Sequence, residues 1–174
     1  PVGTTTITWF VIDNNGLLSL CSQDITITDE ENPVITCAPN QTQTADPGVC
    51  DAAVTVAGPV TSDNCGISSV GNNYNGSSDA TGNYPVGTTT VIWTVTDIYG
   101  NTASCTQEIA VTDDENPTIT CAADQTQTAD AGVCTAAVTV TGPTFGDNCP
   151  GSAVLNDYNA GADASDTYPV GTTT

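Results

Sequence analysis

The chain has 174 residues, no Lys, Arg, His or Met, and 20 acidic residues, so its formal net charge is −20. Nucleic acid is excluded as a partner, because binding to phosphates needs Lys or Arg, and no apolar run is long enough to insert into a membrane. The length allows one domain or two small ones. Self-repulsion between so many carboxylates destabilises a compact state unless cations gather on it.

Val, Ile, Thr, Tyr and Trp dominate the ordered-looking segments, and this is the composition of β-strands. The chain has eight cysteines, no His and no C-x-x-C pair. This pattern predicts disulfides rather than a zinc site, and therefore an oxidising, extracellular or cell-surface location. The sequence starts at Pro1, so we expect a processed product or a window of a longer protein.

The sequence repeats itself every 84 residues. The segment 1–6 recurs as 85–90 and again as 169–174, and each cysteine has a counterpart 84 positions away. We interpret residues 32–115 as one complete repeat. Residues 1–31 are then the C-terminal strand pair of a preceding repeat, and residues 116–174 are the N-terminal two-thirds of a following one.

In the complete repeat, a first strand is expected over residues 34–37. Residues 50–57 alternate and place Ala52, Val54 and Val56 on one face, as in a half-buried strand. A short strand is expected over residues 67–70. The polar segment 72–82 predicts irregular structure or an edge strand.

The strongest strand pattern covers residues 88–96, where Val91, Trp93 and Val95 face one way. Asp97 to Asn101 forms a predicted hairpin turn, and residues 103–112 form the last strand. No stretch has a helical period. Short strands with frequent turns predict a small antiparallel β-sandwich. Trp93 and its counterpart Trp9 are both expected in the core.

Several motifs in a fixed order resemble one known family. They are Pro33 to Cys37, Asp63 to Cys65, Tyr84 to Val91, Thr96 to Cys105, and Val111 to Asp113. In this order they are similar to the hyalin repeat (HYR) domain. The resemblance implies tandem immunoglobulin-like antiparallel β-sandwiches stapled by disulfides. Proteins of this family are extracellular, with long arrays on bacterial surfaces and in adhesion or matrix proteins.

The resemblance also implies a disulfide pairing. Family members with only two cysteines keep the positions of Cys37 and Cys105, so these two are expected to pair. Cys50 would then pair with Cys65. In the next repeat Cys134 would pair with Cys149, while Cys121 would bond Cys21 of another copy, or both would bond residues outside this sequence.

In an immunoglobulin-like sandwich, the entering linker, the loop after the second strand and the last hairpin turn cluster at one end. Acids and amides occupy these places here, and oxygen ligands from several segments suit Ca²⁺. The first predicted calcium junction contains Asp29, Glu30, Glu31, Asn32, Asp63, Asn64, Asp97 and Asn101. The second contains Asp113, Asp114, Glu115, Asn116, Asp147 and Asn148. The alternative is a solvated acidic linker in which these Asp and Asn side chains only make turns.

Other features carry less chemistry. Asn40 and Asn75 begin N-glycosylation patterns. An enzyme is not expected, because the chain has no His or Lys to act as a general base near neutral pH. The cysteines all have structural places, which leaves no free nucleophile.

These features predict a structural repeat module of an extracellular filament or cell-surface stalk, rigidified by disulfides and junction calcium. Its expected partners are copies of itself, arranged head to tail. The copies would be linked as one continuous chain or by strands that one subunit donates to the next. The alternative function is a surface adhesin that binds glycans or other cells.

Overall fold

The computed structural model describes residues 2–172, and every regular element over these residues is a β-strand, which confirms the expected all-β class. No helix of this part of the chain is long and apolar enough to cross a membrane. The strands are β1 (Gly3–Ile12), β2 (Leu18–Ile27), β3 (Val34–Thr36), β4 (Gln41–Thr44), β5 (Asp51–Val54), β6 (Val60–Ser62), β7 (Ile67–Asn72), β8 (Gly82–Pro85), β9 (Gly87–Asp97), β10 (Thr102–Thr112), β11 (Thr118–Thr120), β12 (Thr135–Val138), β13 (Thr144–Gly146) and β14 (Asp166–Pro169).

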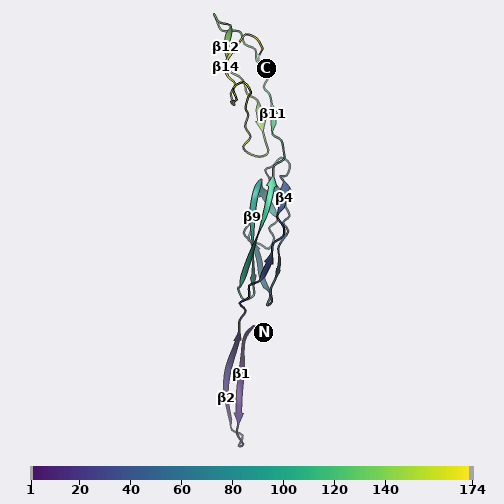
Figure 1. Ribbon diagram of the computed structural model, residues 1–174, viewed down its shortest axis with the longest axis vertical. Helices are drawn as coiled ribbons and strands as arrows, with labels where there is room; N and C mark the ends of the chain where they lie inside the picture. The colour runs from purple at the N-terminus through teal and green to yellow at the C-terminus, as the bar shows by residue number, and fades with distance from the viewer. Residues whose placement is uncertain (1, 173–174) are drawn as a thin grey trace. The chain divides into compact units, whose positions relative to one another are not determined.

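The largest sheet has four strands in the order β4-β10-β9-β7 (Figure 1). β7 runs antiparallel to β9, with Asn72 opposite Trp93. Alternate side chains of a strand point to opposite faces, and in β9 the alternation leaves Val91, Trp93 and Val95 fully buried. The predicted turn is present, because the backbone N–H of Asp97 donates to the carbonyl oxygen of Asn101 at 3.0 Å.

A buried polar network lies beside this apolar row. The indole N–H of Trp93 donates to Oε1 of Gln107 at 3.1 Å. The amide of Gln107 donates in turn to the carbonyl oxygen of Pro39 at 3.0 Å and to Oε1 of Gln41 at 3.2 Å. A buried polar group without a partner costs about 1–3 kcal/mol. The network removes that cost for both Trp93 and Gln107.

Two smaller sheets, the antiparallel pair β3-β6 and the pair β5-β8, complete residues 34–85. The alternating patterns predict β3, β5, β7, β9 and β10, but not the short strands β4, β6 and β8. Tyr84 in β8 is fully buried and contributes one of the largest side chains of the core. A disulfide joins Cys37, just after β3, to Cys105 in β10, with 5.8 Å between the two Cα atoms. This is the bond that the family resemblance implies.

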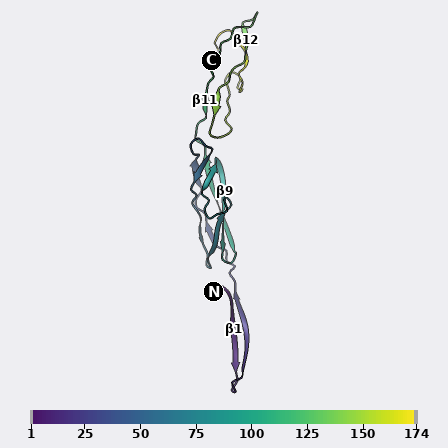
Figure 2. The same ribbon diagram turned by 180° about the vertical axis from the view of Figure 1, so that it is seen from behind.

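β1 and β2 form a separate hairpin, paired from Gly3 opposite Ile27 to Ile12 opposite Leu18 (Figure 2). Its large apolar side chains are exposed except for the half-buried Ile7, and Trp9 is 58% exposed. The prediction that Trp9 lies in a core is therefore wrong in this structure. The reason is that none of the described residues covers this face of the hairpin, whereas Trp93 is fully buried in the complete repeat.

Residues 116–172 contain two further two-stranded sheets, β11-β13 and β12-β14. In β12, Ala136 is buried. A broad hollow lies beside this strand, and Cys121, Gln125, Val138 and Tyr168 are among the residues that line it. Among the described residues 116–172, none forms a counterpart of β9 or β10.

Candidate metal centre

Three carboxylates from distant parts of the sequence converge at one place. Asp29 lies after β2, Asp63 lies after β6, and Asp97 is the last residue of β9. One carboxylate oxygen from each lies within 4.8 Å of the others. Asp97 is buried, while Asp29 and Asp63 are half-buried. The structure thus brings together the three acids that the sequence places at the linker, the loop and the hairpin turn.

Asp63 and Asp97 each use one carboxylate oxygen, Oδ1, to form a turn. Oδ1 of Asp63 accepts hydrogen bonds from the backbone N–H groups of Cys65 and Gly66, both at 2.8 Å. Oδ1 of Asp97 accepts in the same way from Tyr99 and Asn101, both at 2.8 Å. These are the turns of the alternative interpretation. They orient each side chain and leave its second oxygen for another role.

The second oxygens lack protein donors at two of the three acids. Oδ2 of Asp29 and Oδ2 of Asp63 are buried and have no hydrogen-bond partner. At the third acid, the amide of Asn101 donates to Oδ2 of Asp97 at 2.8 Å and also contacts the carbonyl oxygen of Asp29 at 3.3 Å. Charged oxygens that are buried without a partner are strongly unfavourable. A cation placed among them would remove this cost.

The surroundings of the cluster also shift the pKa values of Asp97 and Cys65. Burial acts to raise the pKa of Asp97, but the hydrogen bonds from Asn101, Tyr99 and Gly100 outweigh it, so its pKa lies below the usual value and the acid is ionised at neutral pH. Partial burial raises the pKa of the Cys65 thiol, and the neighbouring carboxylate of Asp29 raises it further. The cluster is therefore a concentration of negative charge with no basic residue in the chain to balance it.

The other residues predicted for this junction are arranged differently. Glu30 and Glu31 have exposed side chains and lie outside the group of three acids, and Asn32 and Asn64 are exposed as well. Asn101 is present but uses its amide as a donor to Asp97 rather than offering an oxygen. The three carboxylates of Asp29, Asp63 and Asp97 therefore make up the candidate site.

The second predicted junction has fewer of these features. Oδ1 of Asp147 and Oδ1 of Asn148 are buried without a hydrogen-bond partner. The amide of Asn148 donates to Oδ1 of Asp113 at 3.2 Å. The remaining predicted residues, Asp114, Glu115 and Asn116, have exposed side chains. The counterpart of Asp97 would be position 181, which the printed sequence does not contain.

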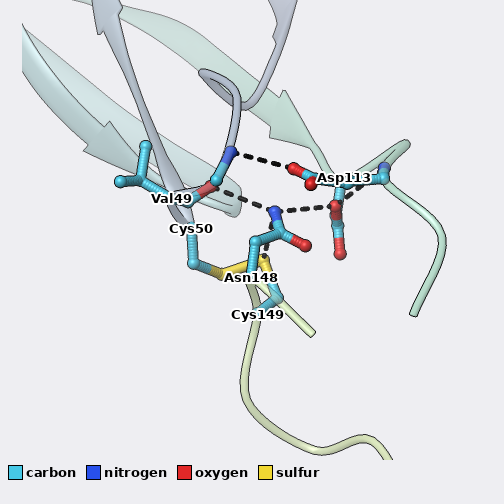
Figure 3. The surroundings of a disulfide bond; sticks show 7 residues. Val49, Cys50, Asp113, Asn148 and Cys149 are labelled. Carbon is cyan, nitrogen blue, oxygen red and sulfur yellow. Dashed lines mark hydrogen bonds between the residues drawn. A yellow bond between two sulfur atoms is a disulfide. The ribbon is translucent and has the colours of Figure 1, made fainter. Parts of the chain in front are cut away.

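A second disulfide lies next to this junction (Figure 3). It joins Cys50 to Cys149, with 4.8 Å between the two Cα atoms. The predicted pairs Cys50–Cys65 and Cys134–Cys149 are therefore wrong. That prediction placed both partners inside one repeat, whereas the turn that ends at Cys50 contacts the loop that holds Cys149. Cys65 and Cys134 then have no disulfide partner in the described residues, and the same is true of Cys21 and Cys121.

Comparison with known proteins gives a family match over residues 28–111, described as the HYR domain. Residues 28–111 of the chain belong to the HYR domain family. The match includes the motifs from Pro33 to Val111 that carry the resemblance, and the acids Asp29, Asp63 and Asp97 all lie inside this HYR segment.

Relatives extend beyond the HYR segment. Hyalin of Strongylocentrotus purpuratus is 32% identical over 180 residues, which cover 100% of this chain and 14% of that protein. Hyalin of Lytechinus variegatus is 29% identical over 178 residues, which cover 99% of this chain and 32% of that protein. The chain thus spans less than a third of the length of either relative. No solved structure matches the chain.

Both predicted glycosylation acceptors lie in the HYR segment, and both are exposed. The amide nitrogen of Asn40 donates to Glu108 at 3.2 Å. The amide nitrogen of Asn75 donates to the carbonyl oxygen of Asp79 at 2.8 Å. An attached glycan would replace one of the two amide hydrogens and leave the other for these contacts.

Proposed function

We propose that this chain is a structural repeat module of an extracellular filament or cell-surface stalk. Its HYR repeats, which we take to be immunoglobulin-like β-sandwiches, follow one another head to tail, and Ca²⁺ stiffens the junctions. No catalytic role is part of the proposal. The observation that carries it is the exposed hairpin β1-β2, which displays side chains that the complete repeat buries.

The match between hairpin and repeat holds residue by residue. Subtracting 84 from Trp93, Gln107 and Val111 gives Trp9, Gln23 and Ile27. The first three are buried, whereas their hairpin counterparts are exposed. The hairpin therefore carries both the apolar row and the glutamine that satisfies the indole N–H in the complete repeat.

The complementary surface is present in residues 116–172. The hollow beside β12 is lined by Gln125, Val138 and Tyr168, the counterparts of Gln41, Val54 and Tyr84. In the complete repeat Gln41 accepts a hydrogen bond from Gln107 of β10, and Val54 and Tyr84 are buried. Full burial of each large apolar side chain contributes roughly 1.5–3 kcal/mol. A hairpin of this type from a neighbouring repeat or copy therefore fits the hollow, and repetition of that contact produces an open fibre.

Assembly tests this arrangement. The 174-residue chain should form head-to-tail oligomers in calcium, measured by analytical ultracentrifugation and electron microscopy. Trp9→Asp should abolish them, because it places a charge in the contact. Leu18→Asp is the matched control, since Leu18 is also exposed on the hairpin but its counterpart, Thr102, is exposed in the complete repeat. Equal assembly of both variants would remove the support for the hairpin, and short stalks with a distinct tip would favour an adhesin instead.

The proposal that Ca²⁺ binds at the junction rests on Oδ2 of Asp29 and Oδ2 of Asp63, which are buried without a hydrogen-bond partner. Ca²⁺ accepts six to eight oxygen ligands in flexible geometry, which suits a site built from three segments and water, whereas Mg²⁺ demands a stricter octahedron. Ca²⁺ binding would also relieve the repulsion between three carboxylates whose nearest oxygens lie within 4.8 Å of one another.

Chelation tests the calcium site. Ca²⁺ should raise the melting temperature reported by Trp93 fluorescence, more than Mg²⁺ does, and EDTA should reverse the rise. Asp63→Asn should remove most of it, because the amide keeps the turn acceptor and loses the charge. Asp124→Asn, an exposed acid outside the cluster, is the control for net charge. Identical melting in Ca²⁺ and EDTA would overturn the site.

A further inference from the structure

The Cys50–Cys149 disulfide links two different copies of the 84-residue sequence. Cys50 is the second cysteine of the complete repeat. Cys149 is the counterpart of Cys65 and is thus the last cysteine before the hairpin strands of the next repeat. The bond therefore joins one repeat to its successor rather than closing a loop inside either.

Hydrogen bonds on both sides of the bond make this a built contact. The backbone N–H of Gly48 donates to Oε2 of Glu115 at 2.9 Å. The amide of Asn148 donates to the carbonyl oxygen of Val49 at 3.1 Å and to Asp113 at 3.2 Å (Figure 3). We call residues 46–51 the cysteine turn. We call residues 147–149, together with the acidic segment 113–115, the cysteine receptor.

A second cysteine turn exists at residues 130–135 and has the same backbone conformation. The N–H of Asp130 donates to the carbonyl oxygen of Thr135 at 2.8 Å, and the equivalent bond of the first turn is 2.7 Å. The following bond, from Val133 to Asp130, is 3.2 Å long in both turns. Gly132 has a φ of 83°, and Gly48 has a φ of 76°. This second turn ends at Cys134, which is exposed and has no disulfide partner in the described residues.

A second cysteine receptor exists at residues 63–65 with the acidic segment 29–31. Asp63, Asn64 and Cys65 repeat the sequence Asp-Asn-Cys of residues 147–149. In the acidic segments, Asp29 and Glu31 are the counterparts of Asp113 and Glu115. The side chains of Asn64 and Glu31 are exposed. The receptor around Cys65 thus has the same groups that hold the first cysteine turn, but Cys65 has no disulfide partner in the described residues.

We propose that Cys65 and Cys134 are the two halves of a further inter-repeat disulfide, formed with other copies of this repeat. The cysteine turn 130–135 of one copy docks on the receptor around Cys65 of the next, as residues 46–51 dock on the receptor around Cys149. The inference rests on the head-to-tail arrangement proposed above. Every junction then carries one covalent staple in addition to the bond inside each repeat.

Formation of the Cys65–Cys134 disulfide is a two-electron oxidation and therefore needs an electron acceptor. A small-molecule disulfide of the extracellular medium is a sufficient one. The thiolate of Cys134 attacks it, forms a mixed disulfide and releases one small thiol. The thiolate of Cys65 then attacks the Cys134 sulfur and displaces the second small thiol. Two protein thiols and one small disulfide thus become one protein disulfide and two small thiols.

Isotope mixing and disulfide mapping test the staple. Equal amounts of ¹⁵N-labelled and unlabelled full-length chain are refolded together in a glutathione redox buffer with Ca²⁺, alkylated, and cleaved on the N-terminal side of Asp. Trypsin is unsuitable, because the chain has no Lys or Arg. Each cysteine of interest then lies in its own peptide: 46–50, 63–78, 130–146 and 147–156.

The expected products are peptide 46–50 joined to 147–156, and peptide 63–78 joined to 130–146 with one labelled and one unlabelled half. In a Cys21→Ala/Cys121→Ala background, which removes the other two free thiols, a ladder of disulfide-linked oligomers should appear on non-reducing gels. The further substitution Cys65→Ser should remove this ladder and leave the thiol of Cys134 open to alkylation. Bonds of Cys50 to Cys65 or of Cys134 to Cys149 overturn the proposal. So does a Cys65–Cys134 pair found only within one chain. If the chains associate while the thiols of Cys65 and Cys134 both stay free, the inter-repeat disulfide is overturned and the head-to-tail arrangement is not. If the chains do not associate at all, the result contradicts the proposed function as well.

Discussion

Removal of the Cys37–Cys105 disulfide should produce the largest loss of stability in the complete repeat. The two cysteines are 68 residues apart in sequence. In the chain-entropy description, a cross-link that closes a loop of this length stabilises the folded state by about 4 kcal/mol. Domains of this size have unfolding free energies of about 5–15 kcal/mol in total. The double variant Cys37→Ala/Cys105→Ala should therefore lose a large part of its stability.

The assay is urea unfolding followed by tryptophan fluorescence. Trp93 is fully buried and reports on the repeat, while Trp9 is exposed and is replaced by Phe in every sample. The control is Cys21→Ala, which removes an exposed thiol without a disulfide partner in the described residues. The unfolding free energy of the double variant should fall by about 4 kcal/mol. A fall of less than about 1 kcal/mol would refute the loop-entropy reasoning and show that strand pairing and packing stabilise the fold without this disulfide.

Three further predictions concern the same repeat. Gln107→Leu should lower the unfolding free energy by about 1–3 kcal/mol, because it leaves the indole N–H of Trp93 and the carbonyl group of Pro39 unpaired, whereas Gln23→Leu on the exposed hairpin should not. Gly82→Ala should destabilise by about 1–3 kcal/mol, since its Cβ would lie 2.9 Å from the ring of Tyr74, and Gly58→Ala, with nothing within 4 Å, is the matched control in the same urea series. Hydrogen bonds from the backbone N–H and the hydroxyl of Thr81 lower the pKa of Asp79 below its usual value. Asp79 should therefore stabilise the fold above the unfolded-state pKa and lose that contribution as pH falls through the lowered value, so Asp79→Asn should melt at a lower temperature at pH 6 but lose less on acidification to pH 3.

Alternation and turn chemistry explain most of what the sequence predicts correctly. Val91, Trp93 and Val95 specify β9 because every second residue is large and apolar. The short strands β4, β6 and β8 carry little such signal, since Gln41–Thr44 and Gly82–Pro85 gain their pairing from neighbours distant in sequence. The polar composition of residues 72–82 predicts irregular structure. The buried side chain of Asn72 accepts hydrogen bonds from the backbone N–H groups of Tyr74 and Asn75 and so organises the segment after β7.

The candidate site was predictable to the extent that its residues belong to turns. Asp29, Asp63 and Asp97 each lie where a strand ends or a linker enters, so a fold that brings these ends together also brings the acids together. The exposure of Glu30 and Glu31 depends on which way the linker turns, and composition does not determine that. The pairing of Cys50 was missed because four cysteines per repeat suggest closed pairs within it, whereas the actual partner lies 99 residues away in sequence.

The Cys50–Cys149 disulfide limits how far the chain can be stretched between Cys37 and Cys149. Tension entering before Cys37 and leaving after Cys149 can pass from Cys37 to Cys50 and then cross the second bond. Only the thirteen residue steps from Cys37 to Cys50 can straighten, which is about 45 Å at full extension, even if every strand between the two ends comes apart. A pulled chain of this kind would yield a little and then hold, in the way a tether with a built-in stop does.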